Sequence, residues 1–300
     1  MIVSVSRRTD IPACYFPWFL RRLEEGFAYT RNPMRFHQVS RVSLRPEDVD
    51  GFVFWTKNPL PMLAHLNRLQ EYAYYVQFTL TAYGPDLEPG LPDKDGVLIP
   101  AFQELARRIG PERVIWRYDP ILLTGRYTIE AHLRRLEEIA RRLEGCTRRC
   151  VISFLDMYRH LQGPAQALGM RAPTEEDACR LAEGLARAAS ARGISLQTCA
   201  EVGEYAAQGV SHGACVDTAL LSRIAGREIA VPRDCHQRPG CGCAVSVDIG
   251  QYDTCPHGCR YCYAVHSPGA LQRSMQAHNP LSPLLCGELT PEDTVRDRHS

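Results

Sequence analysis

The sequence predicts an α/β protein built as a single (β/α) barrel, either partial or a full TIM-type barrel. Short β-rich runs alternate with amphipathic stretches of helical length along most of the chain, which is the pattern of βαβ units around a parallel sheet. Polar residues follow the predicted strands repeatedly, at the strand ends where a parallel barrel carries its chemistry. No glycine-rich dinucleotide fingerprint follows a predicted strand, which disfavours an open Rossmann sheet.

The predicted strands are short runs rich in β-branched and aromatic residues, bounded by polar or turn-forming residues. They cover residues 2–6, 51–55, 74–81, 113–117, 150–154, 195–199 and 244–248. The last of these strands leads into a loop that carries three cysteines.

The predicted helices lie between these strands and show apolar residues at helical spacing. Helix stop signals are clear at Gly110-Pro111 and at Gly145, and Thr174 with Asp177 begins a capping box. The helices are expected at residues 17–26, 60–70, 99–109, 128–143 and 174–191, with a weaker unit at 210–224 and a surface loop at 85–96.

The composition is that of an ordinary globular protein. The 300 residues are 45% hydrophobic and 23% charged, and the net charge of +1 gives no global basic field for nucleic acid. No stretch is apolar for long enough to span a bilayer, and the N-terminus lacks the pattern of a signal peptide. We therefore expect a cytoplasmic protein with no membrane partner. Residues 1–230 should form the barrel units, and residues 231–300 a cysteine-rich segment that completes the barrel.

Thirteen cysteines are better explained by metal or cluster ligation than by disulfides in a cytoplasmic chain. Cys255, Cys259 and Cys262 stand at spacings of four and three. Three thiolates on one loop can hold three corners of a [4Fe-4S] cluster and leave the fourth iron open for a small molecule. Zinc is the alternative, held by three of these cysteines and one of the others.

With Tyr261 directly before its third cysteine, the loop resembles the cluster loop of the radical S-adenosylmethionine (SAM) superfamily. The ending Tyr261-Cys262-Tyr263-Ala264 is most similar to the spore photoproduct lyase-like branch. The whole chain also resembles an uncharacterised bacterial family that carries this loop near its C-terminus. The resemblance implies reductive cleavage of SAM to a 5′-deoxyadenosyl radical, which abstracts a hydrogen atom from a substrate.

The resemblance extends to the order of other elements. Thr56-Lys57-Asn58 and Arg117-Tyr118-Asp119-Pro120 are similar to a Thr-Lys-Ser element and an Arg-x-Asp-Pro element of the spore photoproduct lyase-like proteins, in the same order. In those proteins the cluster loop follows the first barrel strand, whereas here it comes last. We therefore expect a circular permutation, in which the strand at 244–248 lies beside the strand at 2–6.

These similarities suggest roles for the polar residues at the strand ends. Tyr261 would lie near the adenine of SAM or pack as a structural aromatic residue. Lys57 would pair with the SAM carboxylate, unless it is a surface lysine. Arg117 would bind the same carboxylate or pair with Asp119. Further candidates for contacts with the methionine amine, the ribose or the substrate are Asp10, Thr81 and Glu201.

Arg7 and Arg8 end the first predicted strand. As neighbours in a strand they should face opposite ways, so at most one should point into the barrel mouth. An arginine there would suit an anionic group, and a solvated pair is the alternative.

A second set of cysteines could hold an auxiliary iron–sulfur cluster or a zinc ion. The favoured ligands are Cys199, Cys215, Cys241 and Cys243, with Cys235 or His236 as substitutes. Buried cysteines that act as small apolar residues are the alternative for Cys199 and Cys215. The remaining cysteines are expected to be structural: Cys14, Cys146, Cys150, Cys179 and Cys286.

Taken together, these patterns favour a radical SAM enzyme that receives electrons from a flavodoxin or a ferredoxin. The alternatives are a zinc-binding structural protein and an iron–sulfur electron-transfer or redox-sensing protein without SAM chemistry. The substrate is open between nucleic acid, a peptide and a small molecule, because function does not follow from fold.

Overall fold

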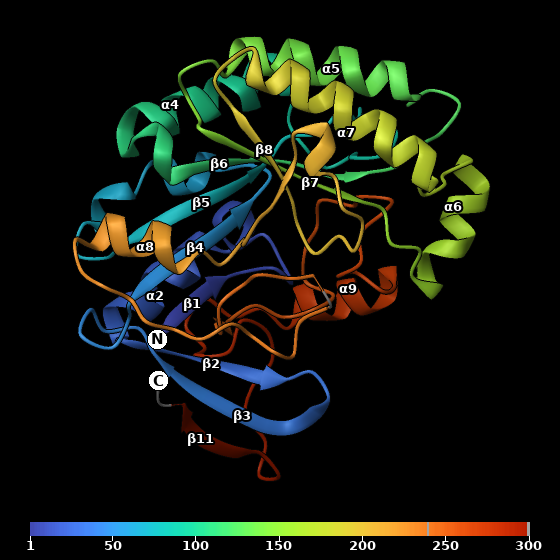
Figure 1. Ribbon diagram of the computed structural model, residues 1–300. Helices are drawn as coiled ribbons and strands as arrows, with labels where there is room; N and C mark the ends of the chain where they lie inside the picture. The colour runs from blue at the N-terminus through green and yellow to red at the C-terminus, as the bar shows by residue number, and fades with distance from the viewer. Residues whose placement is uncertain (239, 299–300) are drawn as a thin grey trace.

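The computed structural model describes residues 1–238 and 240–298. Its centre is an eight-stranded parallel sheet in the order β10-β1-β4-β5-β6-β7-β8-β9 (Figure 1). The strands are β1 (Ile2–Val5), β4 (Gly51–Thr56), β5 (Tyr74–Thr79), β6 (Val114–Ile121), β7 (Arg149–Phe154), β8 (Ser195–Thr198), β9 (Ser211–His212) and β10 (Val247–Asp248). The predicted α/β class is confirmed, and a strand overlaps each predicted range, although the range 244–248 contains only the two-residue strand β10. In the described part of the chain no pairing joins β9 to β10, so the sheet is open.

The last strand of the sheet in sequence lies beside the first. Val247 pairs with Val3 and Asp248 with Ser4, in parallel. The Asp248 carboxylate accepts hydrogen bonds from the Ser4 hydroxyl at 2.7 Å, the Ser6 hydroxyl at 2.5 Å and the Arg7 backbone at 2.8 Å. The predicted neighbourhood of these two strands is confirmed, and it places the cysteine loop next to the start of the chain.

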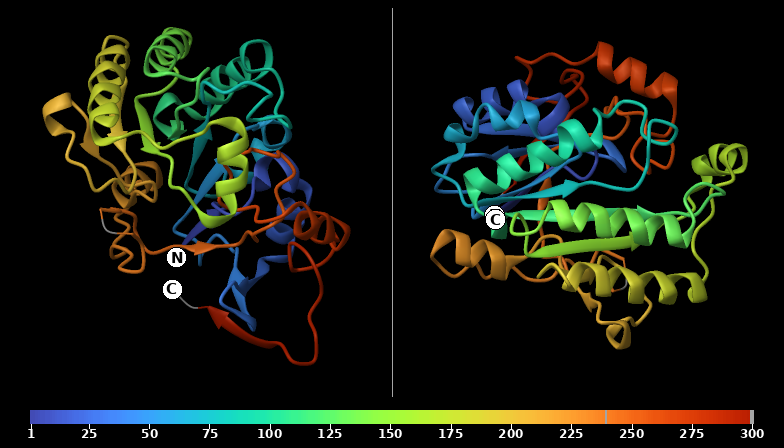
Figure 2. Two further views of the ribbon diagram at one scale, coloured as in Figure 1. Left: turned by 90° about the vertical axis from the view of Figure 1, so that its right-hand side faces the viewer. Right: turned by 90° about the horizontal axis from the view of Figure 1, so that it is seen from above.

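One face of the sheet packs against most of the helices. Alternate strand residues such as Phe54, Phe78 and Trp116 are fully buried there and form the main core with the helices. The covering elements are α1 (Ile11–Cys14), α2 (Phe16–Glu25), α3 (Leu60–Leu63), α4 (Ile99–Ile109), α5 (Ile129–Arg142) and α7 (Glu175–Ser190). Helices α5 and α7 pack side by side, as Figure 2 shows from above.

The other face of the sheet is covered by α8 (Thr218–Ala225) and by the segment that carries Cys241 and Cys243. The strand residues on this side, such as Val53, Tyr75 and Ile115, alternate with those of the main core. Two further helices, α6 (Gln162–Leu168) and α9 (Pro268–Gln276), follow β7 and the cysteine loop. The predicted helix at 60–70 is wrong in part: α3 ends after one turn, His65 has a φ of −129°, and Leu66–Leu69 forms a 3₁₀ turn.

A second sheet was not predicted. It contains β2 (Phe27–Asn32), β3 (Arg35–Ser43) and β11 (Thr294–Arg298), in the order β11-β3-β2. Figures 1 and 2 show it apart from the large sheet, with the end of β11 close to the N-terminus. No helix within the described residues combines the length and the apolar character needed to cross a membrane.

Candidate functional site

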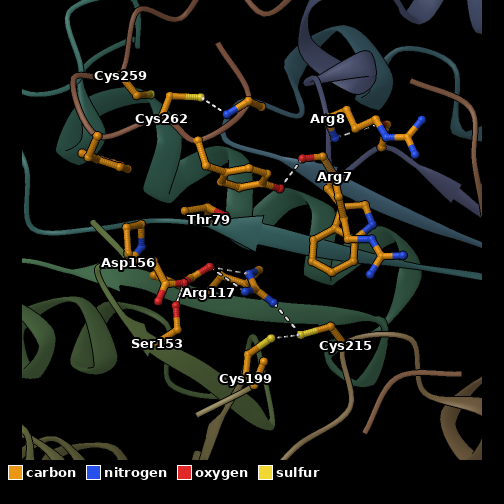
Figure 3. Close-up of a pocket in the computed structure, with 18 of the residues that line it drawn as sticks. Arg7, Arg8, Thr79, Arg117, Ser153, Asp156, Cys199, Cys215, Cys259 and Cys262 are labelled. Atoms are coloured by element: carbon orange, nitrogen blue, oxygen red, sulfur yellow. Dashed lines mark hydrogen bonds and ion pairs between the residues drawn. The ribbon is translucent and has the colours of Figure 1, made fainter. Parts of the chain in front are cut away.

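A cavity of about 450 Å³ lies at the carboxyl ends of the large sheet's strands (Figure 3). Residues that follow or end successive strands line it: Arg7 and Asp10 after β1, Lys57 after β4, Thr79 in β5, Asp119 in β6, Ser153 in β7 and Cys199 after β8. The prediction that the polar strand ends share one pocket is therefore confirmed.

The three cysteines of the loop, Cys255, Cys259 and Cys262, line this same cavity. The loop is fixed by backbone contacts with the 85–96 segment: Arg260 donates to the Leu87 carbonyl and Gly90 to the His257 carbonyl, each at 2.9 Å. A Cβ atom at residue 90 would lie 2.5 Å from the His257 oxygen, so only glycine permits this approach. The predicted surface loop at 85–96 thus supports the cysteine loop.

Asp10 links three segments at one edge of the cavity. Its carboxylate accepts hydrogen bonds from Ala13 at the start of α1 at 3.0 Å and from the Lys57 backbone at 2.7 Å, and it lies 2.9 Å from Nε2 of His257. Burial would lower the pKa of His257, but the Asp10 carboxylate raises it to about 9. Asp10 therefore positions both Lys57 and the cysteine loop.

Glu88 is a buried carboxylate that sequence reasoning missed. It accepts hydrogen bonds from the Lys57 ammonium at 2.7 Å, from the Thr81 hydroxyl at 3.0 Å, and from Lys94 and the Tyr261 hydroxyl. Burial would raise the pKa of Glu88, but the two lysines lower it to about 2. Its position in a Pro- and Gly-rich loop gave no signal of this role.

The Glu88 contacts show where three predicted site residues lie. Lys57 and Tyr261 line the cavity and contact each other at 3.0 Å. Tyr261 also packs against Tyr83, with ring centres 5.3 Å apart. Thr81 is not among the lining residues; it is buried behind Glu88, and Thr79 lines the cavity instead.

Glu201 is likewise outside the lining and accepts a hydrogen bond from the Phe154 backbone at 2.9 Å.

Arg117 forms an ion pair with Asp119. This pairing is one of the two roles that the sequence predicted for Arg117. Nε and Nη2 of Arg117 lie 3.0 and 2.5 Å from one carboxylate oxygen of Asp119, and the other oxygen accepts a hydrogen bond from Ser153. Nη1 of Arg117 lies 2.8 Å from the sulfur of Cys215. The guanidinium also stacks over Trp55, 5.0 Å from its ring centre.

The expectation that at most one of Arg7 and Arg8 faces the pocket is wrong, because both line the cavity. Strand β1 ends at Val5, so the alternation of a strand does not extend to these residues. Arg7 lies over the ring of Trp55 at 5.8 Å, and Arg8 over that of Tyr252 at 5.4 Å.

The second set of predicted cysteines also meets at this cavity. Cys199 and Cys215 have sulfurs 2.9 Å apart, and Cys241 and Cys243 line the same wall. Figure 3 shows Cys199 and Cys215 across the pocket from Cys259 and Cys262, with Arg117 between them. Cys235 is exposed and outside the lining, as is His236. Within residues 1–238 and 240–298, no three His, Cys, Asp or Glu side chains already surround a point suited to a single metal ion.

Cys14 has a position that the sequence did not predict. Its sulfur lies 4.0 Å from Nε2 of His257, and its side chain contacts Cys255. The other cysteines expected to be structural lie outside the cavity lining: Cys146, Cys150, Cys179 and Cys286.

Comparison with known proteins places the chain in a family. A family model described as a domain of unknown function, DUF1848, matches residues 2–264. The chain belongs to the DUF1848 family. No curated protein and no solved structure matches it. The DUF1848 match covers the whole large sheet and both sets of cysteines, and it ends just after Cys262.

Proposed function

We propose that this DUF1848 protein is a cytoplasmic radical SAM enzyme. Cys255, Cys259 and Cys262 would hold a [4Fe-4S] cluster, and SAM would bind at its open iron. The observation that carries the proposal is that all three thiols of one loop line the cavity that receives the polar strand ends. When bound, the cluster and SAM would supply a 5′-deoxyadenosyl radical that takes a hydrogen atom from a substrate.

The residues present fit these two groups. Three thiols on one loop match a cluster with an open corner, because thiolates are the usual ligands of such clusters. The Cys262 sulfur accepts a hydrogen bond from the Ala264 backbone at 3.4 Å, and hydrogen bonds to the sulfurs tune such clusters. A cavity of about 450 Å³ is within the usual size of sites for small molecules and cofactors.

The polar residues of the cavity would orient SAM and the substrate. Lys57 presents an ammonium group that Glu88 and Tyr261 hold in place, which suits a carboxylate. Arg117 is held by Asp119 and Trp55 and would bind or orient an anionic group beside it. Trp55, Tyr252 and Tyr261 give the cavity aromatic walls that would shield the reacting atoms from water.

The fold supports the proposal through the order of its parts. Because β10 pairs with β1, the cysteine loop would take the place of a loop that follows the first strand if the sheet is a permuted partial barrel. We propose that the open sheet is such a partial (β/α) barrel. The electron donor would be a flavodoxin or a ferredoxin, and the substrate class stays open.

The test is SAM cleavage by protein reconstituted with iron and sulfide in the absence of oxygen. With dithionite as reductant, the wild type should convert SAM to 5′-deoxyadenosine, measured by liquid chromatography and mass spectrometry. Cys259→Ala should abolish this product, because it removes one of the three cluster ligands.

Cys235→Ala is the matched control, because Cys235 is exposed and lies outside the cavity lining. It should retain wild-type cleavage. Equal product from Cys259→Ala and Cys235→Ala, or no product from the wild type with a full iron content, would reject the proposal.

A further inference from the structure

The wall opposite the cysteine loop carries a set of thiols that the proposed reaction does not use. We infer that Cys199, Cys215, Cys241 and Cys243 form a second metal centre, closed by four thiolate ligands and separate from the Cys255–Cys262 loop. This inference does not depend on the proposed function.

The first support is the convergence of thiols from separate parts of the chain. Cys199 follows β8, Cys215 precedes α8, and Cys241 and Cys243 precede β10. The Cys199 and Cys215 sulfurs lie 2.9 Å apart, and Cys241 and Cys243 line the same cavity, with Cys243 next to Cys215. Metal binding would turn these neighbouring thiols toward one point. The last three cysteines are each at most 5% exposed.

The second support is the irregular structure of the segment that they hold. Residues 226–238 and 240–246 contain no helix and no strand beyond an isolated bridge between Arg233 and Ala244. Short segments without a core of their own are commonly fixed by metal ions or disulfides. Four thiols at the junction of this segment with β8 and α8 are placed to fix it.

The third support is the surroundings of the sulfurs. Thiolate ligands bring negative charge, and Nη1 of Arg117 lies 2.8 Å from the Cys215 sulfur. The Val216 backbone donates a hydrogen bond to the Cys243 sulfur at 3.4 Å. A cation and a backbone donor beside the sulfurs are typical of the outer shell of a thiolate metal site.

The number of thiols indicates the kind of centre. Four thiolates complete the coordination of zinc or of a four-iron cluster and leave no position for substrate. This centre would therefore stabilise the wall of the cavity rather than bind SAM. Zinc and iron–sulfur share the same thiolate chemistry, and the experiment separates them.

The experiment uses the full chain with Cys255, Cys259 and Cys262 all replaced by alanine, so that only the second set can bind metal. The protein is reconstituted without oxygen, in one arm with zinc alone and in the other with iron and sulfide. Metal is then measured by mass spectrometry. We expect tight retention of about one zinc ion in the first arm or about four iron atoms in the second.

Adding Cys241→Ser and Cys243→Ser to this variant should remove the metal, whereas adding Cys235→Ser should not. Because substitutions at buried cysteines can unfold a protein, a second measurement leaves the second set intact and uses the variant that lacks only Cys255, Cys259 and Cys262. Removal of the metal by a chelator should expose residues 226–246 to limited proteolysis while the rest of the chain stays resistant.

Three results would overturn the inference. They are no retained metal in either arm, the same metal content per chain with and without Cys241 and Cys243, and a Cys199–Cys215 disulfide that persists in buffer with a reductant. None of these results bears on SAM cleavage by the first loop. Conversely, failure of the wild type to cleave SAM would not change the metal content measured for the second cysteine set.

Discussion

At the scale of single residues, Glu88 organises the side of the cavity beneath the cysteine loop. It is 2% exposed and pairs with two lysines, while the Tyr261 and Thr81 hydroxyls donate to the same carboxylate. Removing one partner of a buried ion pair leaves the other charge without compensation. Lys57 and Lys94 would both lose their anionic partner if Glu88 were neutral.

We predict that Glu88→Gln lowers the free energy of unfolding by about 3 kcal/mol. Urea denaturation of the reduced protein, followed by circular dichroism, measures this. Glu104→Gln is the control, because Glu104 also pairs with two cations, Arg107 and Arg108, on an exposed helix surface. It should leave the denaturation curve close to that of the wild type. Equal curves for both variants would contradict the role given to Glu88.

At the scale of elements, the predictable parts are those with local signals. Thr128 caps α5 through the Ala131 backbone, and Thr174 with Asp177 forms the expected capping box of α7. The second sheet carried no such signal. Much of β3 and all of β11 is exposed, and their pairing joins distant parts of the chain. Cys255, Cys259 and Cys262 were predictable from their spacing, and Cys199 from its position after a predicted strand. Glu88 and Cys14 were not predictable, because tertiary contacts alone bring them to the loop.

Helix α5 contains a buried histidine whose titration should be visible in stability. Burial lowers the pKa of His132 from its ordinary 6.5 to about 4. Its Nε2 lies 2.9 Å from the Leu122 carbonyl oxygen, and its Nδ1 2.9 Å from the Tyr118 hydroxyl. The unfolded chain thus binds the proton at higher pH than the folded protein, so acid favours unfolding between about pH 6.5 and 4.

We predict that the wild type loses about 3 kcal/mol more of its unfolding free energy over this pH range than His132→Gln does. The glutamine amide can still donate to the Leu122 carbonyl but does not titrate. Urea denaturation at a series of pH values measures the difference. Parallel pH dependences for the two proteins would show that His132 titrates normally in the folded state.

At the scale of the whole molecule, the large sheet draws its edge strand β10 from the C-terminal part of the chain and pairs it with β1. The N-terminus and the end of β11 lie close together in Figures 1 and 2. Chain ends that lie close together usually tolerate being joined, with new ends opened in an exposed turn.

We therefore predict that a permuted chain folds. It would join Arg298 to Met1 through a flexible linker and open new ends after the exposed Gly226, so that the cysteine loop precedes β1. Circular dichroism and a cooperative thermal transition should match those of the wild type. A second permutant opened inside β5 should fail to fold, because it divides a central buried strand. Failure of the Gly226 permutant alone would contradict the proposed permutation.

We propose that the Cys255–Cys262 loop holds a cluster with an open iron that binds SAM. Low-temperature electron paramagnetic resonance of the reduced, anaerobically reconstituted protein tests it most directly. We predict a [4Fe-4S] signal that changes when SAM is added, and we expect the Cys259→Ala variant to show no SAM-dependent change. Zinc in place of iron at this loop, or a cluster signal indifferent to SAM, would contradict it.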